Sequence, residues 1–392
     1  MSEWSTVALK DIAEINPRES IKKGDIAVKV AMDKLQPFCR DIPEIEYEVF
    51  SGGTKFRNGD TIMARITPCL ENGKTAMVNV LDDGQVGFGS TEYIVFRAKK
   101  GISDPYFLYY LVCSPMVREP AIKSMVGSSG RQRVQTDVVQ NLVLSVPSLP
   151  EQVKIGEFLK KIDDKIAVNN KINRNLLEQA VSVFKEKIWS QEKNGTIGEY
   201  CSIKSGFAFK SSWWTDEGVK VIKIGDISQD NLSLETCSHV DEDKVEKAKG
   251  YSVVAGDLVL AMTGATIGKF AMVSEINEPI FVNQRVGKFF LGNEPLKKVP
   301  FIYCTLKMDD VYSEVITRGQ GSAQPNISGA DIMTIPCVIP TQNEIDEFNS
   351  FAEPIFTQLA KNQNESKKLA LLRDSLLPKL MSGELAVSDL DI

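Results

Sequence analysis

Two glycine-rich loops carry the side chains best suited to recognise a ligand. The first, "SSGRQRVQ" from Ser128 to Gln135, contains Arg131, Gln132 and Arg133 and no acidic residue. The second, "TRGQGSAQPN" from Thr317 to Asn326, contains Arg318, Gln320, Gln324 and Asn326. In the DNA major groove Arg pairs with guanine, and Gln or Asn pairs with adenine, through two hydrogen bonds. Taken singly, each loop is better explained as polar surface, but their recurrence at equivalent places in the two halves of the chain favours base recognition.

Other polar side chains are weaker candidates for the same role. They lie in loops that follow strand-like segments of each half, where solvated surface residues are the alternative. These candidates are Arg65, Lys74, Lys269, Gln284 and Arg285.

The residues needed for catalysis or metal binding are missing. "GATIGK" (Gly264 to Lys269) resembles a phosphate-binding loop, but three residues separate its glycines instead of four, and Phe270 replaces Ser or Thr. The chain has one histidine, His239, beside three acidic residues, and seven scattered cysteines without a C-x-x-C pair. We therefore expect no catalytic residues, no metal site and reduced cysteines.

Two long helices are expected to position the candidate loops. Ser148-Leu-Pro-Glu151 and Thr341-Gln-Asn-Glu344 are both capping boxes, 193 residues apart, and each precedes an apolar seam with helical spacing. Polar residues interrupt the seams at the same offset, and we expect them to fix the register of a coiled coil. The seam residues are Ile155, Leu159, Ile162, Ile166 and Asn169 in the first helix, and Ile355, Leu359, Asn362, Leu369 and Leu376 in the second. Pro354 should kink the second helix, and Pro378 should end or bend it.

The segments before the helices also repeat. "NGDTIMAR" (Asn58 to Arg65) matches "AGDLVLAM" (Ala255 to Met262), and short strands alternate with turns and a few helices in each half. The sequence therefore predicts a mixed α/β (α+β) fold with a pseudo-two-fold internal repeat, in which two antiparallel helices form a coiled coil. The expected parts are domain 1 (1–147), a central helix (148–190), domain 2 (191–340), and a C-terminal helix with a short tail (341–392).

Composition describes an ordinary soluble protein. Hydrophobic residues make up 43% and charged residues 25% of the chain, and no long apolar run is present, so we expect a cytoplasmic protein. The net charge of −6 predicts weak non-specific DNA affinity unless a basic partner takes part.

At this point the chain resembles the DNA specificity subunits of type I restriction-modification systems. The matching pieces are "VPSLPEQVKIGEFLKKIDDKI", "TGATIGK", "GSAQPNIS" and "LLPKLMSGEL". The resemblance implies that each domain is a target recognition domain for one half of a bipartite, asymmetric double-stranded DNA sequence. It also implies that the helices set the spacer and dock methyltransferase subunits, expected to number two, with restriction subunits joining the full complex.

By this resemblance no cofactor belongs to the chain itself, and S-adenosylmethionine belongs to the methyltransferase partners. Two other functions remain open. A fused or stand-alone modification enzyme would bind S-adenosylmethionine as an isolated chain. A coiled-coil adaptor that binds only proteins would have no sequence-dependent DNA affinity.

Overall fold

The chain forms two compact units, described by a computed structural model over residues 4–320 and 325–390. Unit 1 is the chain up to Val168 together with the segment from Lys367 onward, and unit 2 is Asn169–Ser366. Both divisions fall inside long helices. Each unit therefore contains one domain and a part of each long helix.

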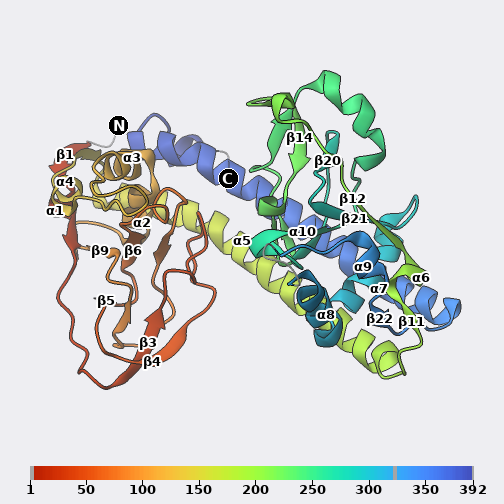
Figure 1. The fold of residues 1–392 in the computed structure, drawn as a ribbon. Coiled ribbons are helices and arrows are strands. Elements are labelled where there is room, and N and C mark those ends of the chain that lie inside the picture. Colours follow the sequence, from red (N-terminus) through yellow and green to blue (C-terminus); the bar gives the residue numbers. More distant parts are fainter. Residues whose placement is uncertain (1–3, 321–324, 391–392) are drawn as a thin grey trace. The chain divides into compact units, whose positions relative to one another are not determined.

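Among the helices of residues 4–320 and 325–390, two are long and the others are short (Figure 1). They are α1 (Leu9–Ile12), α2 (Pro105–Cys113), α3 (Pro115–Lys123), α4 (Thr136–Gln140), α5 (Leu149–Phe184), α6 (Ile197–Tyr200), α7 (Pro295–Leu306), α8 (Asp309–Gly319), α9 (Gly329–Met333) and α10 (Gln342–Ser382). A π-helical turn, η1 (Lys185–Trp189), extends α5. Short 3-10 segments are η2 (Ser211–Trp213), η3 (Ile224–Asp226), η4 (Glu242–Tyr251), η5 (Gly264–Thr266) and η6 (Val387–Asp389).

The described residues of unit 1 form two four-stranded sheets and one two-stranded sheet. The first has the order β2-β9-β6-β7, formed by β2 (Ala13–Ile15), β9 (Tyr93–Ala98), β6 (Thr61–Ala64) and β7 (Thr75–Met77). The second has the order β4-β3-β8-β5, formed by β4 (Glu46–Val49), β3 (Ile26–Val30), β8 (Gly87–Gly89) and β5 (Thr54–Phe56). The short sheet joins β1 (Ser5–Ala8) to β10 (Val143–Val146).

Unit 2 repeats this plan. Its first sheet has the order β12-β21-β18-β19, formed by β12 (Ser202–Ser205), β21 (Val286–Phe290), β18 (Leu258–Ala261) and β19 (Phe270–Met272). Its second has the order β13-β17-β14-β20, formed by β13 (Trp214–Thr215), β17 (Ser238–Val240), β14 (Val219–Ile222) and β20 (Ile280–Val282). Two-stranded sheets join β11 (Gly195–Thr196) to β22 (Pro336–Cys337), and β15 (Ile227–Ser228) to β16 (Asn231–Leu232).

The two units share the connectivity of their first sheet strand for strand, and each second sheet contains one parallel pair, β3 with β8 and β14 with β20. The predicted mixed fold with an internal repeat and two long antiparallel helices is confirmed.

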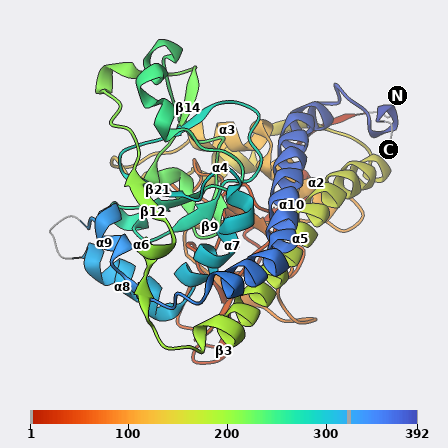
Figure 2. The same ribbon diagram turned by 90° about the vertical axis from the view of Figure 1, so that its right-hand side faces the viewer.

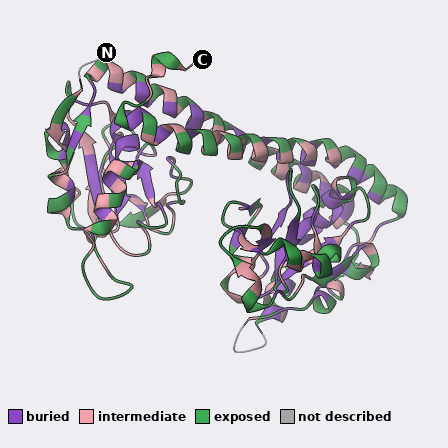
Figure 3. Ribbon diagram, turned by 90° about the horizontal axis from the view of Figure 1, so that it is seen from above, coloured by how far each residue is buried: buried purple, intermediate pink, exposed green. Residues whose placement is uncertain are grey.

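Alternation of side chains explains how the first sheet holds each domain together. In β6, Met63 packs with Phe96 and the α2 helix, whereas Ile62 faces the opposite side with Val95. Unit 2 repeats the arrangement in β18. Because neighbouring side chains of a strand point to opposite faces, both faces of the sheet are covered, and every residue of β6 and β18 is buried. Figure 3 shows buried strands inside both domains.

The repeated Gly-Asp motif before these strands has a structural role. Asp60 accepts a hydrogen bond from the backbone N-H of Arg57 (2.7 Å) and pairs with Arg97 (2.7 Å). Asp257 likewise accepts from Val254 (2.8 Å) and pairs with Lys288 (2.7 Å). Each buried carboxylate thus closes a turn and is balanced by a cation.

Helices α5 and α10 lie side by side and antiparallel (Figures 1 and 2). In unit 1, Asp163 of α5 pairs with Arg373 of α10 at 2.6 Å. In unit 2, the Asn362 amide donates to Asn173 at 2.8 Å, and Asn169 donates to Glu365 at 2.8 Å. Of the expected seam residues, Ile166, Leu369 and Leu376 are half-buried, and the buried ones are Ile155, Leu159, Ile162, Asn169, Ile355, Leu359 and Asn362.

The proline and capping predictions for the helices have different outcomes. Helix α10 does not end at Pro378 but continues to Ser382, because Leu380 and Met381 are buried in the unit 1 core. The helical assignment is continuous through Pro354, and a kink there stays a prediction. Within the described residues Ser148 makes no side-chain cap. Gln152 instead accepts from the Asp104 N-H (3.1 Å) and donates to the Pro147 carbonyl (3.0 Å), while Thr341 and Glu344 form the predicted capping box.

Candidate nucleic-acid interface

Three loops of unit 1 meet at one end of the first sheet. We call residues 65–74, 89–92 and 126–135 the unit 1 loop cluster. The Arg65 N-H donates to the Glu92 carbonyl (2.9 Å), the Val134 N-H to the Arg65 carbonyl (2.8 Å), and the Thr67 N-H to the Gln132 carbonyl (3.0 Å). Gly127 has φ +135°, and a Cβ there would lie 2.9 Å from the Arg131 carbonyl oxygen, so the loop requires glycine.

Unit 2 has the same backbone connections. We call residues 262–269, 283–285, 319–320 and 325–328 the unit 2 loop cluster. The Met262 N-H donates to the Arg285 carbonyl (3.0 Å), and the Ile327 N-H donates to the Met262 carbonyl (2.9 Å). The bridge between Ile66 and Arg133 is matched by one between Thr263 and Asn326. Arg285 therefore takes the place of Glu92, and Asn326 that of Arg133.

The candidate side chains of unit 1 fall into two groups. Arg131 is exposed and Gln132 half-buried, and neither side chain has a hydrogen-bond partner within the described part of the chain. Arg65 donates to the Val134 carbonyl (3.2 Å), and its buried Nε has no partner among the described residues. Lys74 donates to the Met32 carbonyl (2.8 Å). Arg65 therefore joins two segments of the loop cluster, and Lys74 joins the cluster to the segment that follows β3.

Arg133 makes the most specific contact of this cluster. Its Nε lies 2.9 Å and 3.0 Å from the two Glu92 carboxylate oxygens, and one terminal nitrogen lies 2.7 Å from the nearer of them. The hydrogen bond with Glu92 raises the pKa of the Arg133 guanidinium, so this side chain stays charged. Both side chains are partly exposed, at 46% and 24%.

The candidate residues of unit 2 are placed differently. Gln284, Arg285, Gln320 and Asn326 are exposed, and Lys269 is half-buried. Arg318 lies in the last turn of α8, where it pairs with Glu314 (2.8 Å) and donates to the Asp331 carbonyl (2.8 Å). Its placement differs from the expected loop position, because these contacts join α8 to α9. Gln324 lies outside the described residues.

Glu92 is a polar residue of the unit 1 loop cluster that the sequence analysis did not identify. Arg, Gln and Asn are the residue types that pair with guanine and adenine, and an acidic residue is not among them. The segments "GSTEYIVF" (Gly89 to Phe96) and "VNQRVGKF" (Val282 to Phe289) are 193 residues apart in the sequence, which places Glu92 opposite Arg285. Two residues of opposite charge at equivalent positions were the signal that could have identified it.

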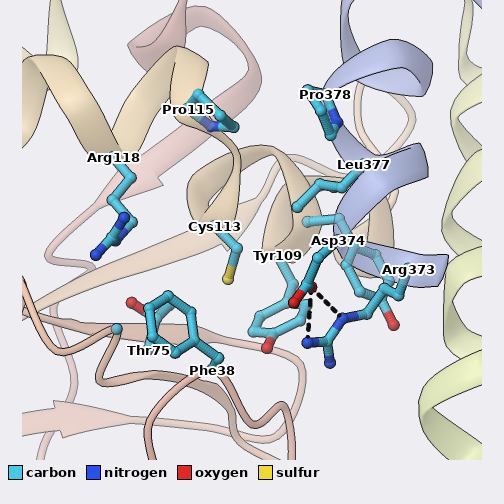
Figure 4. Close-up of a pocket in the computed structure, with 12 residues that line it drawn as sticks. Phe38, Thr75, Tyr109, Cys113, Pro115, Arg118, Arg373, Asp374, Leu377 and Pro378 are labelled. Atoms are coloured by element: carbon cyan, nitrogen blue, oxygen red, sulfur yellow. Dashed lines mark hydrogen bonds and ion pairs between the residues drawn. The ribbon is translucent and has the colours of Figure 1, made fainter. Parts of the chain in front are cut away.

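A cavity of about 240 Å³ lies in unit 1 beside α10 (Figure 4). Phe38, Tyr109, Cys113 and Leu377 line it, and the Arg373–Asp374 ion pair (2.8 Å) lies at its edge. Burial raises the pKa of the Cys113 thiol to about 12, which disfavours nucleophilic chemistry. Unit 2 has a larger cavity of about 650 Å³ beside α5, lined in part by Asn173 and Tyr303. Tyr110 and Tyr303 are 193 residues apart and line one cavity each.

The described residues contain neither a metal site nor a membrane-spanning helix. Within residues 4–320 and 325–390 no group of three or more His, Cys, Asp or Glu side chains could hold a metal ion. None of the helices there combines the length and apolar character that a bilayer span requires.

Comparison with known proteins identifies the family. The sequence model described as "Type I restriction modification DNA specificity domain" matches residues 1–178 and 190–369. The "Type I restriction enzyme MjaVIII specificity subunit" of Methanocaldococcus jannaschii is 25% identical over 329 residues, covering 79% of this chain and 76% of that protein. The "Type I restriction enzyme HindI specificity subunit" of Haemophilus influenzae is 23% identical, covering 98% of this chain and 100% of that protein.

A solved structure supports the same fold. The type I restriction-modification system S subunit from M. genitalium superposes with a TM-score of 0.53 at 18% identity, covering 97% of this chain and 96% of that chain. The chain belongs to the type I restriction modification DNA specificity domain family, and the resemblance recognised in the sequence is confirmed.

Proposed function

We propose that the chain is a DNA-reading subunit in which the unit 1 and unit 2 loop clusters each bind one half of a bipartite double-stranded target. The observation that carries this proposal is the equivalence of the two clusters. They have the same backbone connections yet present different side chains, Arg133 and Glu92 in one and Asn326 and Arg285 in the other. Two readers built in this way suit two different short sequences.

We expect the chemistry to reside in partners. In this proposal two methyltransferase subunits bind S-adenosylmethionine and methylate adenine, restriction subunits join the complete cytoplasmic complex, and this chain supplies the sequence selection. An isolated chain that bound S-adenosylmethionine would contradict this division and support a modification enzyme.

The test of DNA reading uses methylome sequencing of a host that expresses the chain with its methyltransferase partner. Replacing both Arg131 and Arg133 by Ala should weaken the base preference in one half of the methylated sequence and leave the preference in the other half unchanged. Replacing Lys22 and Lys23 by Ala removes the same charge from exposed positions outside the loop cluster and should leave both halves unchanged. Equal loss at both halves would mean that the arginines contact only phosphates.

We further propose that the helix pair sets the spacer between the half-sites, because α5 and α10 both pass from one unit into the other. Residues 165–171 of α5 and 364–370 of α10 lie between the Asp163–Arg373 and Asn173–Asn362 pairs. Deleting both heptads keeps the two pairs and shortens the helices by about 10 Å. The preferred spacer should shorten by roughly 3 base pairs, and an unchanged spacer would refute the proposal.

We propose that the two cavities contribute to docking two methyltransferase subunits, since equivalent surfaces suit two copies of one partner. Phe38 lines the unit 1 cavity and is 53% exposed. Phe38→Glu should weaken co-purification with the methyltransferase partner, whereas Tyr47→Glu, at a 69% exposed residue of β4, should not. Equal recovery of partner with both variants would exclude this cavity.

A further inference from the structure

The Glu92–Arg133 pair suggests which base unit 1 reads, an inference that rests on the proposed DNA-reading function. The Glu92 carboxylate occupies the Nε edge of the guanidinium, at 2.7 to 3.0 Å. Of the five guanidinium hydrogens, three remain free to contact DNA: both hydrogens of Nη1 and the second hydrogen of Nη2, the terminal nitrogen bound to Glu92. Nη1 also lies 3.5 Å from the Arg131 carbonyl oxygen, which is a long contact. The end of the side chain therefore presents two parallel N-H donors.

Two parallel donors match one base edge in the major groove. Guanine offers two acceptors there, O6 and N7, whereas adenine offers N7 next to an N6 amino donor, which would oppose an arginine N-H. An arginine held by a carboxylate along its Nε edge is thus oriented for guanine.

The exposure of the Glu92–Arg133 pair indicates that Glu92 serves to orient the Arg133 side chain rather than to stabilise the fold. Surface ion pairs at 46% and 24% exposure add little stability. The backbone of both residues is fixed, because Arg133 and Val126 exchange two hydrogen bonds (2.8 and 3.0 Å) and the Glu92 carbonyl accepts from Arg65. Holding a flexible arginine in one orientation before it meets DNA reduces the ordering cost on binding.

Unit 2 provides the contrast. Arg285 replaces Glu92 there, so no carboxylate stands at the equivalent position, and Asn326 replaces Arg133. The side-chain amide of Asn can both accept from adenine N6 and donate to N7.

We propose that Glu92 is a specificity-determining residue that positions Arg133 to read a guanine in the half-site of unit 1, and that unit 2 reads an adenine at its equivalent position through Asn326. The unit 1 half-site then contains a G·C pair whose recognition depends on both Glu92 and Arg133.

The test is methylome sequencing of a host that expresses variants of the full chain with the methyltransferase partner. Glu92→Gln and Arg133→Lys should each lose roughly 5- to 150-fold of the discrimination at one G·C pair, the range expected for a two-bond contact, and leave the unit 2 half-site unchanged. Arg133→Lys keeps the charge but loses the two-pronged geometry. Arg133→Asn should shift the preference at that pair from guanine to adenine. Thermal unfolding of Glu92→Gln should match the wild type.

Three results would overturn this inference. They are a unit 1 half-site without a G·C pair, an unchanged base preference in both Glu92→Gln and Arg133→Lys, and a uniform loss of methylation without a change of preference. The Arg131→Ala/Arg133→Ala variant separates these failures from failure of the proposed function. If that variant changes the unit 1 half-site while Glu92→Gln and Arg133→Lys do not, unit 1 reads DNA, but not through an arginine positioned by Glu92. If it changes neither half-site, the proposed function is contradicted as well.

Discussion

The two units share a backbone arrangement but use different side-chain contacts where the long helices pack against each domain. In unit 1, Asp163 accepts hydrogen bonds from Arg373 and from the hydroxyl of Tyr110, both at 2.6 Å, in a buried setting. In unit 2 the residues 193 positions away are Phe356, Ala180 and Tyr303, and the Tyr303 and Phe356 rings pack edge to face with centroids 5.2 Å apart. The repeat thus preserves the position of a tyrosine but exchanges an ion pair for an aromatic contact.

The difference bears on how the helices choose their partners. If α5 of one chain paired with α5 of another in the same register, Asp163 would face Ala180 and would lose its arginine. A buried ion pair is weak support for stability, but leaving one of its charges unpaired is costly. The Asp163–Arg373 pair therefore favours pairing of α5 with α10 over pairing of like helices.

The largest expected effect comes from breaking this ion pair. Arg373→Met leaves the Asp163 carboxylate buried beside Tyr110 and should lower the free energy of unfolding of unit 1 by about 3–5 kcal/mol. Denaturant unfolding measures it. The double variant Asp163→Leu/Arg373→Met should recover most of the loss, and a loss below about 1 kcal/mol in the single variant would contradict a paired buried charge.

The two tyrosines provide a matched pair of smaller effects. Tyr110→Phe removes a hydrogen bond to a buried carboxylate and should cost about 1.5–3 kcal/mol. The Tyr303 hydroxyl donates to Asp230 (2.6 Å), which is more exposed and also pairs with Lys307, so Tyr303→Phe should cost about 0.5–1.5 kcal/mol. Denaturant unfolding of the two variants compares these losses of free energy. A larger loss in Tyr303→Phe than in Tyr110→Phe would contradict the account, in which the carboxylate bound by Tyr110 is the more deeply buried one.

Substitutions at the first residues of α5 and α10 should have the smallest effects on stability. Thr341→Ala removes the capping box of α10 and should cost about 1 kcal/mol. Ser148→Ala should cost a few tenths of that, because Gln152 rather than Ser148 makes the side-chain contacts at the start of α5. Hydrogen exchange of the first turn of each helix measures the effect, and equal protection loss in both would contradict the difference.

The pH dependence of the α10 start follows from the same box. Hydrogen bonds from Thr341 hold the pKa of Glu344 below its ordinary value in the folded chain. The stabilisation is therefore complete above the unfolded pKa and is lost as the pH falls through the lower folded value. Hydrogen exchange followed from neutral to acidic pH should show the first turn of α10 losing protection, whereas Thr341→Ala should show a smaller pH effect.

Periodicity and repetition predicted the fold because both are properties of local sequence. The repeat located the paired strands that begin at Thr61 and Leu258, 197 residues apart, and the helix starts at Leu149 and Gln342, 193 residues apart. Apolar spacing did not distinguish Leu376, which is half-buried, from Leu377, which is buried, because the facing helix decides which row of side chains is covered.

The candidate site was harder to predict. Residue type alone identified Arg133, but its carboxylate partner, Glu92, lies 41 residues away. The two residues meet because Arg65 binds the Glu92 backbone and the next residue, Ile66, forms a bridge with Arg133. Arg318 looked like a loop residue, yet α8 extends to Gly319 and commits this side chain to a structural contact. Local sequence patterns do not predict contacts of this kind, which join residues far apart in the chain.

The most direct test of two independent readers is the methylome of hosts that express the chain with its methyltransferase partner and carry changes in one loop cluster at a time. Changes at Arg131 and Arg133 should alter one half of the methylated sequence, changes at Arg285 and Asn326 should alter the other, and the spacer should stay constant in both. If changes in either cluster altered both halves together, or neither, the two units would not read DNA separately.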